Sequence, residues 1–360
     1  MIVQTFNSNQ IGGSIVKITN KDNNAIILDY GFDLEGNNPK ELPNLDNVIG
    51  IVISHGHVDH IGMIDSLKNI DVYFSEDAYG SYKIYQKHMR KMIPSNIKTF
   101  RNELFLDTFN IKLIKTSHSS FDSNMILINV DNKNILYTGD FRLHGLESNS
   151  ELEDKNIDLL ITEGTNITNN LEAKKEQKIS NELKELQEKY KYIFVLSSST
   201  NSERILSIGQ SVNDGRYFIV DKFQKQLLDY YKKVDPKYNT KALYYDNNLD
   251  KKMRKLGFTM LVRQTDFFKK IMDEYKEDNY MLVYSMWRGY KETNKELKEF
   301  VDSYNNTFIH TSGHVSRPDL ERFINLINPK DIMVLHTDNK ELFNNMKING
   351  NIIMGNIKEY

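Results

Sequence analysis

The chain has no cysteine and only six prolines among its 360 residues. Without cysteine it can form no disulfide and can offer no thiolate to a metal ion. It also lacks a hydrophobic run long enough to span a membrane. Its first residues, MIVQTF, lack the basic and long apolar segments of a signal peptide. We therefore expect a cytoplasmic protein without a membrane partner.

An excess of charge of either sign is also lacking, because 47 Lys and Arg face 49 Asp and Glu, for a formal net charge of -2. Proteins that bind nucleic acid usually gather basic residues, so composition alone does not suggest such a partner. The hydrophobic content of 39%, with 20 Tyr and 18 Phe, excludes a disordered chain. The length exceeds that of a usual single domain and predicts two domains.

The sequence is instead rich in metal-binding side chains at residues 55–60, which read HGHVDH. Residues 48–54 before them are apolar and uncharged, as expected of a buried strand that carries a site at its end. Residues two apart in an extended turn project to the same side, so His55 and His57 can converge on one ion. Asp59 and His60 can then face a second ion. This hexapeptide predicts a two-metal hydrolytic centre, in which a shared water becomes a hydroxide nucleophile.

Three more candidate ligands follow strand-like runs elsewhere in the chain. His118 lies in TSHSS, Asp140 ends NILYTGD, and His336 ends DIMVLH. Strand ends that lead into polar turns are where α/β proteins place their sites. Taken singly, Asp140 could also be a turn carboxylate, and both histidines could be solvated loop residues.

The predicted metal ligands are His55, His57, Asp59, His60, His118, Asp140 and His336. Imidazole and carboxylate ligands favour two divalent zinc ions, although manganese or iron would suit them almost as well.

On these motifs the chain resembles the metallo-β-lactamase superfamily and, within it, the β-CASP nucleases, the group that contains ribonuclease J. Asp29 in AIILDYG corresponds to the first motif, an acid that supports the metal-binding loop. HGHVDH, His118 and Asp140 in TGDFR correspond to the next three. The resemblance covers nearly the whole chain. Since the sequence ends at Tyr360, we expect the C-terminal domain of ribonuclease J to be missing.

Three further motifs separate β-CASP nucleases from other members of the superfamily. Glu163 in ITEGT, His314 in TSGHVS and His336 match them. The resemblance implies an α/β fold, an αββα sandwich with an inserted α/β β-CASP domain. Alternating strand-like and helical segments in residues 189–305 agree with an inserted parallel sheet. We therefore expect a discontinuous metallo-β-lactamase domain of residues 1–188 and 306–360, and a β-CASP domain of residues 189–305.

Helical spacing of apolar residues predicts individual helices within these domains. The expected helices cover residues 61–67, 174–190, 221–234 and 291–304.

The resemblance implies a ribonuclease that hydrolyses RNA phosphodiesters and leaves 5′-phosphate and 3′-hydroxyl ends. Asp59 would orient the nucleophile, and His314 would give a proton to the leaving oxygen. Glu163 would hold the imidazole of His314, although a simple turn cap also accounts for this acid. DNA as the substrate, exonuclease or endonuclease action, and the oligomeric state stay open.

A further similarity lies in residues 199–205, STNSERI, which match the stretch that opens the inserted domain of ribonuclease J. There Ser199, Asn201 and Arg204 would bind substrate. An amphipathic helix capped by Ser202, with Arg204 in solvent, accounts for the pattern equally well. Residues 284–290, YSMWRGY, depart from the glycine-rich segment of the family, and ordinary core packing could account for their aromatic side chains.

Two other classes of function stay open from the sequence. A small-molecule metallohydrolase acting on an ester, thioester or lactam would share the metal ligands, but it gives no reason for Glu163, His314 or the insert. A non-catalytic RNA-binding subunit would be expected to have lost ligands, and this chain retains them.

Overall fold

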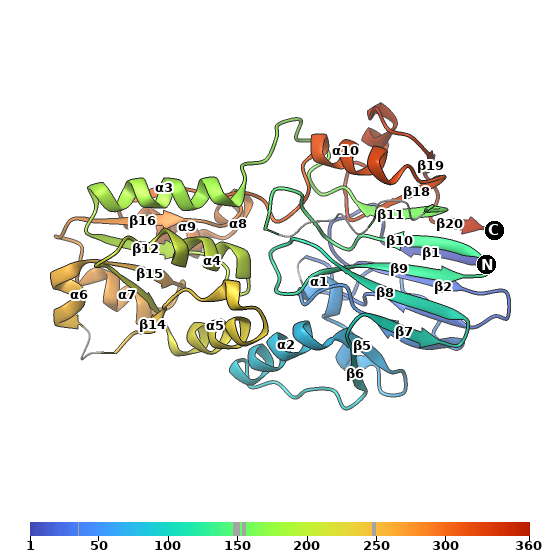
Figure 1. The fold of residues 1–360 in the computed structure, drawn as a ribbon, viewed down its shortest axis with the longest axis horizontal. Helices are drawn as coiled ribbons and strands as arrows, with labels where there is room; N and C mark the ends of the chain where they lie inside the picture. Colours follow the sequence, from blue (N-terminus) through green and yellow to red (C-terminus); the bar gives the residue numbers. More distant parts are fainter. Residues whose placement is uncertain (35, 147–151, 153–155, 247–249) are drawn as a thin grey trace. The chain divides into compact units, whose positions relative to one another are not determined.

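The computed structural model describes residues 1–34, 36–146, 152, 156–246 and 250–360, and the chain divides into two compact units. Unit 1 comprises Met1–Ala173 and Gly313–Tyr360, and unit 2 comprises Lys174–Ser312 (Figure 1). Unit 2 thus includes residues 174–188 and 306–312, beyond the expected inserted segment. The domain limits at 189 and 305 stay a prediction.

Unit 1 is built on two sheets of seven strands each. The strands of the first sheet are β1 (Ile2–Phe6), β2 (Ile15–Thr19), β3 (Ala25–Leu28), β4 (Val48–Val52), β5 (Val72–Ser75), β6 (Ile97–Phe100) and β20 (Ile357–Glu359). Those of the second are β7 (Glu103–Leu106), β8 (Phe109–Lys115), β9 (Asn124–Val130), β10 (Lys133–Tyr137), β11 (Leu159–Glu163), β18 (Asp331–Leu335) and β19 (Asn351–Ile353). They are ordered β20-β1-β2-β3-β4-β5-β6 and β19-β18-β11-β10-β9-β8-β7.

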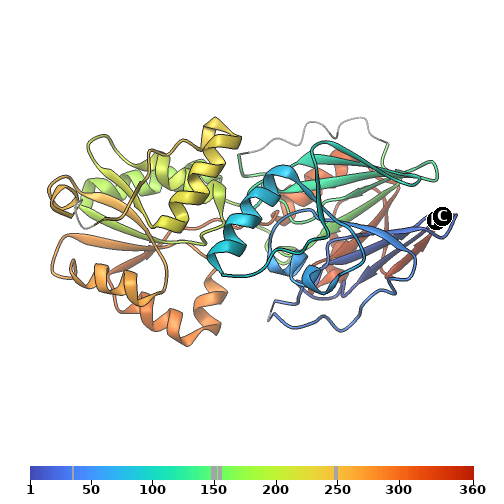
Figure 2. The same ribbon diagram turned by 90° about the horizontal axis from the view of Figure 1, so that it is seen from below.

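Both sheets of unit 1 are buried on two faces. In β3, Ile26 and Leu28 join the core between the sheets, whereas Ile27 joins a separate core on the outer face. The helices of this unit are α1 (Val58–Ile61), η1 (Ile64–Ser66), α2 (Glu76–His88), α10 (Arg317–Ile327) and η5 (Lys340–Asn345). Figures 1 and 2 show α2 against the first sheet and α10 against the second. These layers confirm the predicted αββα sandwich.

The strand directions bring distant residues to one edge of the second sheet. β10 pairs with β11 in parallel, and β11 pairs with β18 in parallel, with Glu163 opposite Leu335. The carboxyl ends of parallel strands lie at the same edge, so the residues that end or follow these strands meet there. Those residues are Asp140, Glu163 and His336.

Unit 2 is a parallel six-stranded sheet with helices, as the alternating pattern predicts. Its strands are β12 (Tyr192–Leu196), β13 (Tyr217–Val220), β14 (Leu243–Tyr244), β15 (Phe258–Val262), β16 (Tyr280–Tyr284) and β17 (Asn306–Phe308). Its helices are α3 (Glu176–Lys189), α4 (Ser202–Ser211), α5 (Lys222–Val234), η3 (Pro236–Tyr238), α6 (Asp250–Leu256), α7 (Asp266–Asp273), α8 (Arg288–Thr293) and α9 (Lys295–Asp302). The strand order is β14-β13-β15-β12-β16-β17.

The helices expected over 174–190 and 221–234 are confirmed by α3 and α5, but two other expectations are wrong. The helix expected over 61–67 is replaced by α1, which begins directly after His57, and by η1. The helix expected over 291–304 is interrupted at Asn294, whose side chain accepts the Leu297 N–H and so begins α9.

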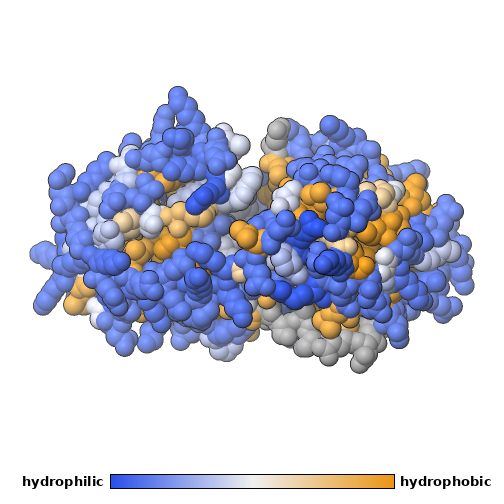
Figure 3. Space-filling view, turned by 90° about the horizontal axis from the view of Figure 1, so that it is seen from above, coloured by the Kyte–Doolittle hydropathy of each residue, from blue (hydrophilic) through white to orange (hydrophobic). Residues whose placement is uncertain are grey.

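The face drawn in Figure 3 is mostly hydrophilic, with separate apolar patches on each unit. In the described part of the chain, no helix has both the length and the apolar character that crossing a membrane requires.

Candidate metal centre

One buried carboxylate organises the loop that follows β4. Asp29, directly after β3, accepts the backbone N–H of Ser54 at 2.7 Å and the Ser54 hydroxyl at 2.6 Å. It also accepts His60 Nδ1–H and the Tyr137 hydroxyl, both at 2.7 Å. These bonds connect the ends of β3, β4 and β10, and they direct His60 Nε2 away from Asp29.

A glycine permits the close approach of the neighbouring backbone. A Cβ on Gly31 would lie 1.7 Å from the carbonyl oxygen of Asp59, so no other residue fits there unless the loop moves. Beside it, Tyr30 N–H donates to His60 O at 2.7 Å. The first turn of α1 is thereby held against the end of β3, with Asp59 and His60 on it.

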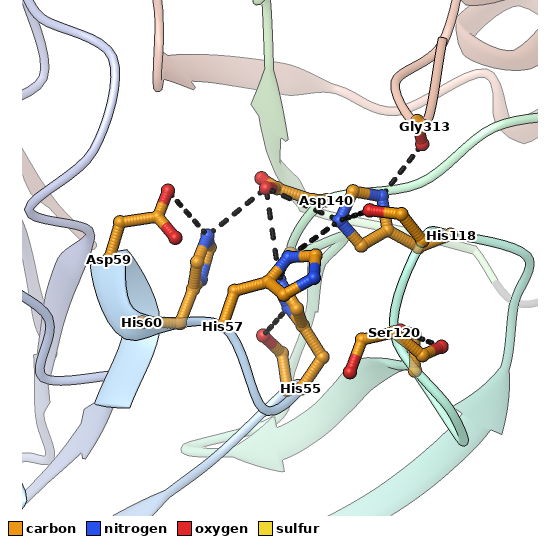
Figure 4. Close-up of polar contacts among 12 residues, drawn as sticks. His55, His57, Asp59, His60, His118, Ser120, Asp140 and Gly313 are labelled. Atoms are coloured by element: carbon orange, nitrogen blue, oxygen red, sulfur yellow. Dashed lines mark hydrogen bonds and ion pairs between the residues drawn. The ribbon is translucent and has the colours of Figure 1, made fainter. Parts of the chain in front are cut away.

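Three histidines form the first group of donor atoms (Figure 4). His57 Nδ1 lies 3.2 Å from His55 Nε2 and 3.1 Å from His118 Nε2. The other ring nitrogens of His55 and His118 lie 3.0 Å from Ser54 Oγ and 2.7 Å from Gly313 O. Because the Ser54 hydroxyl donates its proton to Asp29 and a carbonyl can only accept, both ring nitrogens are the donors. These bonds place the protons on Nδ1, so both Nε2 atoms present lone pairs towards His57.

A second group of donor atoms comprises Asp59, His60, Asp140 and His336. His336 Nε2 lies 3.0 Å from Asp59 Oδ2, and His60 Nε2 lies 3.2 Å from Asp140 Oδ2. His336 follows β18 with a left-handed φ of 55°, which is uncommon for a side chain of its size. Its Nδ1 contacts the Thr165 hydroxyl at 2.9 Å.

Asp140 lies between the two groups. Figure 4 shows it with His55, His57, Asp59, His60 and His118. Its Oδ2 lies 3.8 Å from Nε2 of both His55 and His118. The same oxygen lies 3.2 Å from His60 Nε2 and 3.7 Å from His336 Nε2. A single carboxylate is therefore in reach of both sets of donors.

The donor atoms fit divalent cations. His60 Nε2 and Asp140 Oδ1 are buried and make no hydrogen bond to any residue that the structure describes, which is costly unless another partner is supplied. Zinc binds nitrogen and oxygen at about 2.0–2.2 Å, so tetrahedral ligands lie roughly 3.3–3.6 Å apart. The separations in both groups are close to that value. The side chains together are therefore arranged as divalent-metal binding requires.

Burial controls the protonation of the first group. It lowers the pKa of His57 to about 4 and holds the pKa values of His55 and His118 well below the usual histidine range. All three rings are consequently neutral at neutral pH, which is the form that binds a metal.

Opposite charges control the second group. Burial would raise the pKa of Asp140, but the imidazoles of His336 and His60 outweigh it and hold that pKa well below its usual range. Burial would lower the pKa of His60, but the carboxylates of Asp140, Asp29 and Asp59 outweigh it and raise that pKa well above its usual range. A cation bound at His60 Nε2 would replace this proton.

Glu163 and His314 form a pair beside the second group. Glu163 Oε2 lies 2.9 Å from His314 Nδ1, and Oε1 accepts the Phe141 N–H at 2.8 Å. Glu163 thus binds a backbone amide, as the turn-cap alternative requires, and binds His314 as well. Burial would lower the pKa of His314, but the carboxylates of Glu163 and Asp140 outweigh it and raise that pKa to about 9.

The three residues expected to bind substrate all lie in unit 2. Asn201 caps α4 by accepting the Arg204 N–H at 3.1 Å, so the expected cap, Ser202, is wrong. Arg204 is fully buried against Glu176, with 2.5 Å between its Nε and the carboxylate, so its expected place in solvent is also wrong. Ser199 Oγ accepts from Arg263 at 3.3 Å. Substrate binding by the three stays a prediction.

Sequence reasoning missed two residues that support the centre. Tyr137 donates to Asp29, and Thr165 contacts His336. A tyrosine two residues before Gly139-Asp140 and a threonine after Glu163-Gly164 are ordinary in sequence. Only pairing of β10, β11 and β18 places them beside the ligands.

Comparisons with known proteins agree with this architecture. Residues 12–178 match the metallo-β-lactamase superfamily, and residues 296–343 match the Zn-dependent metallo-hydrolase RNA specificity domain. A solved structure of a protein of unknown function from Enterococcus faecalis V583 superposes with a TM-score of 0.78 at 18% identity, over 99% of both chains. At that identity, the likeness supports the fold alone.

Curated relatives match part of the chain. Ribonuclease J 2 of Streptococcus pyogenes is 28% identical over 169 residues, which are 39% of this chain and 30% of the relative. Ribonuclease J of Helicobacter pylori is 26% identical over 196 residues, 44% of this chain and 26% of the relative. RNase aCSPSF2 of Saccharolobus solfataricus is 29% identical over 185 residues, 43% of this chain and 37% of the relative. The chain spans less than half the length of each.

Proposed function

We propose that this chain, a metallo-β-lactamase-fold hydrolase of the β-CASP type that resembles ribonuclease J, is a metal-dependent ribonuclease. One observation carries the proposal: Asp140 Oδ2 is in reach of both donor groups and lies 3.8 Å from Nδ1 of His314, which Glu163 holds. The proposed metal ligands and the proposed proton donor thereby lie side by side.

The cofactor is proposed to be a pair of zinc ions. His55, His57 and His118 would hold one ion, and Asp59, His60 and His336 the other, with Asp140 shared. When bound, the cations supply a water of lowered pKa and offset the charge on a phosphate oxygen. Imidazole and carboxylate donors favour zinc, while manganese or iron suit the same ligands.

Residues of the chain would orient the attacking water and donate a proton to the leaving oxygen. In hydrolysis the water oxygen bonds to phosphorus, and the bond from phosphorus to the 3′-oxygen breaks. Asp59 is partly exposed beside His336 and would accept a hydrogen bond from the attacking water. His314 has a raised pKa, so at neutral pH its ring can donate the Nε2 proton to the leaving 3′-oxygen. The products are a 5′-phosphate and a 3′-hydroxyl.

RNA is the proposed substrate because the match to an RNA specificity domain includes His314 and His336. Hydrolysis of an ester, thioester or lactam gives no reason for the Glu163–His314 pair.

The test compares nucleic acids of identical sequence. Purified chain with added zinc or manganese is incubated with labelled RNA and DNA carrying 5′-monophosphate or 5′-triphosphate ends. We expect metal-dependent cleavage of RNA, and the product lengths distinguish exonuclease from endonuclease action. The control is the Asp59→Asn variant, which should be inactive. If both nucleic acids stay intact while a small ester or lactam is hydrolysed, the proposal fails.

The proton donor has its own test. His314→Ala should lower the cleavage rate by about 10²- to 10⁴-fold, because a positioned general acid contributes about that much. Metal content, measured by mass spectrometry of the purified protein, should stay unchanged. His88→Ala, at an exposed histidine of α2, is the matched control. Loss of metal together with activity would contradict the role of His314.

A further inference from the structure

Two exposed aromatic side chains stand at the start of α8 in unit 2. Trp287 is the only tryptophan of the chain, and 59% of it is exposed to solvent. Tyr290 is 54% exposed, and the two ring centroids lie 5.4 Å apart with the planes nearly perpendicular, at 89°. Both follow the carboxyl end of β16, and α/β sheets bind ligands at such strand ends.

Core packing does not account for these two rings. Met286 packs partly against the core of unit 2, whereas Trp287 and Tyr290 are not part of that cluster. Trp287 instead lies against Gly289, where a Cβ would come within 2.2 Å of the indole. The Tyr284 hydroxyl donates to Trp287 O at 2.8 Å and holds the backbone. The indole is thus supported on one side while most of it stays in water.

An exposed cation lies between the two aromatic residues. The Arg288 guanidinium lies 4.2 Å from the ring centroid of Phe308, and within the described ranges it forms no ion pair. The next basic residue, Lys291, is by contrast paired with Asp302 at 2.5 Å. Arg288 therefore keeps its charge available for an anion from outside the chain.

We propose that Trp287, Arg288 and Tyr290 form a platform on which unpaired bases of single-stranded RNA stack while a phosphate binds Arg288. Every base has an aromatic face, so such a platform tolerates any sequence. Double-stranded RNA hides those faces in its own stack, so the platform selects single strands. Two exposed aromatic rings beside one exposed guanidinium match a base and its phosphate. The choice of RNA rests on the proposed function.

The lone tryptophan makes the test direct. Metal-free protein is titrated with a short oligoadenylate RNA, so that binding is measured without cleavage, while Trp287 fluorescence and the anisotropy of an end label are recorded together. We expect saturable quenching that follows the anisotropy. Trp287→Leu, which keeps an apolar side chain, should weaken binding by about 10- to 100-fold. Phe267→Leu, at a 52% exposed aromatic residue of α7, should leave binding unchanged.

Further measurements separate base stacking from purely electrostatic binding and from loss of folding. Arg288→Gln should reduce the slope of log affinity against log salt by about 0.7, the loss of one phosphate contact on a single strand. Duplex RNA should neither quench nor compete. Thermal unfolding of Trp287→Leu should match wild type, and Trp287→Phe should retain most of the affinity because it keeps a ring.

The same measurements distinguish a wrong platform from a wrong proposed function. If the end label shows binding and the metal-loaded protein cleaves RNA, but Trp287 is not quenched, RNA binds elsewhere and only the platform is wrong. If RNA neither binds nor is cleaved, both proposals fall. Trp287 fluorescence could also be quenched without RNA as the protein concentration rises, with a dimer seen in sedimentation. That result would identify a self-association surface and overturn the platform.

Discussion

Both units bury clusters of charged side chains, but only the cluster in unit 2 finds hydrogen-bond partners for its charged groups among the residues that the structure describes. In unit 2, Arg204 is fully buried and bonds to Glu176, to the Ser285 hydroxyl at 2.6 Å and to Thr311 O at 3.0 Å. In unit 1, Asp140 and the imidazoles around it leave donor atoms that no described residue satisfies. A closed buried cluster is typical of a structural element, and one whose atoms converge without partners indicates a ligand site.

The largest expected effect comes from substituting Asp140, the proposed shared ligand of unit 1. Asp140→Asn keeps the size of the side chain but removes the charge that both donor groups share. Metal affinity should fall by more than the ~10- to 100-fold typical of residues that only support ligands, and cleavage should be lost with it. Metal content and RNA cleavage are measured on the same preparation. Full metal content in this variant would remove Asp140 from the site.

Substitutions in the Arg204–Glu176 cluster of unit 2 are expected to lower the stability of the fold. Glu176→Ala leaves the Arg204 charge buried without a carboxylate and should lower the free energy of unfolding by about 3–5 kcal/mol. The double variant Glu176→Leu with Arg204→Met should recover most of that loss, because no charge stays buried. Urea unfolding measures both. A small effect of the single variant would mean that water reaches the pair.

Next in size is the support of His60 by Asp29. Asp29→Asn weakens the bond to His60 Nδ1 and should lower metal affinity by about 10- to 100-fold. Asp22→Asn, at an exposed position in the turn between β2 and β3, is the control and should bind metal like wild type. Competition with a chelator measures both. Equal affinities would show that Tyr137 and Ser54 hold the loop without the charge of Asp29.

A smaller effect is expected in the pH dependence of cleavage. The proposed proton donor, His314, can act only when protonated, so the rate should fall as pH rises through its pKa, which Glu163 and Asp140 raise to about 9. Glu163→Gln removes one raising charge while it keeps a hydrogen-bonding side chain. The alkaline limb of the pH–rate profile should therefore move to lower pH. An unmoved limb would show that another group sets it.

The smallest effect is expected at the start of α4. Asn201→Ala removes the side chain that accepts the Arg204 N–H and should lower the free energy of unfolding by about 1 kcal/mol. If Asn201 acts only as a helix cap, RNA cleavage by the folded variant should be unchanged. Ser198→Ala, at the exposed neighbouring turn, is the control for stability. A rise in KM without loss of stability would instead support substrate binding by Asn201.

The strand and motif patterns predicted which side chains gather around Asp140, because most of these residues sit at strand ends. The apolar run before His55 becomes β4, and the one before His336 becomes β18. Of the two alternatives for Arg204, the one that places it in solvent is wrong, although a charged residue in an amphipathic helix is usually exposed. Its partner Glu176 lies 28 positions earlier, and nothing local in the sequence joins the two.

The sequence by itself determined that the four polar side chains of residues 55–60 lie close together, because covalent geometry keeps neighbours on a short loop near one another whatever surrounds them. It also carries the motifs whose resemblance to the metallo-β-lactamase superfamily implied the αββα layers. Only the tertiary structure decided that Asp140 stands between the two donor groups and that Glu163 reaches His314, 151 positions away. The physical reason is that parallel pairing of β10, β11 and β18 sets which strand ends meet, and pairing is a property of the folded chain.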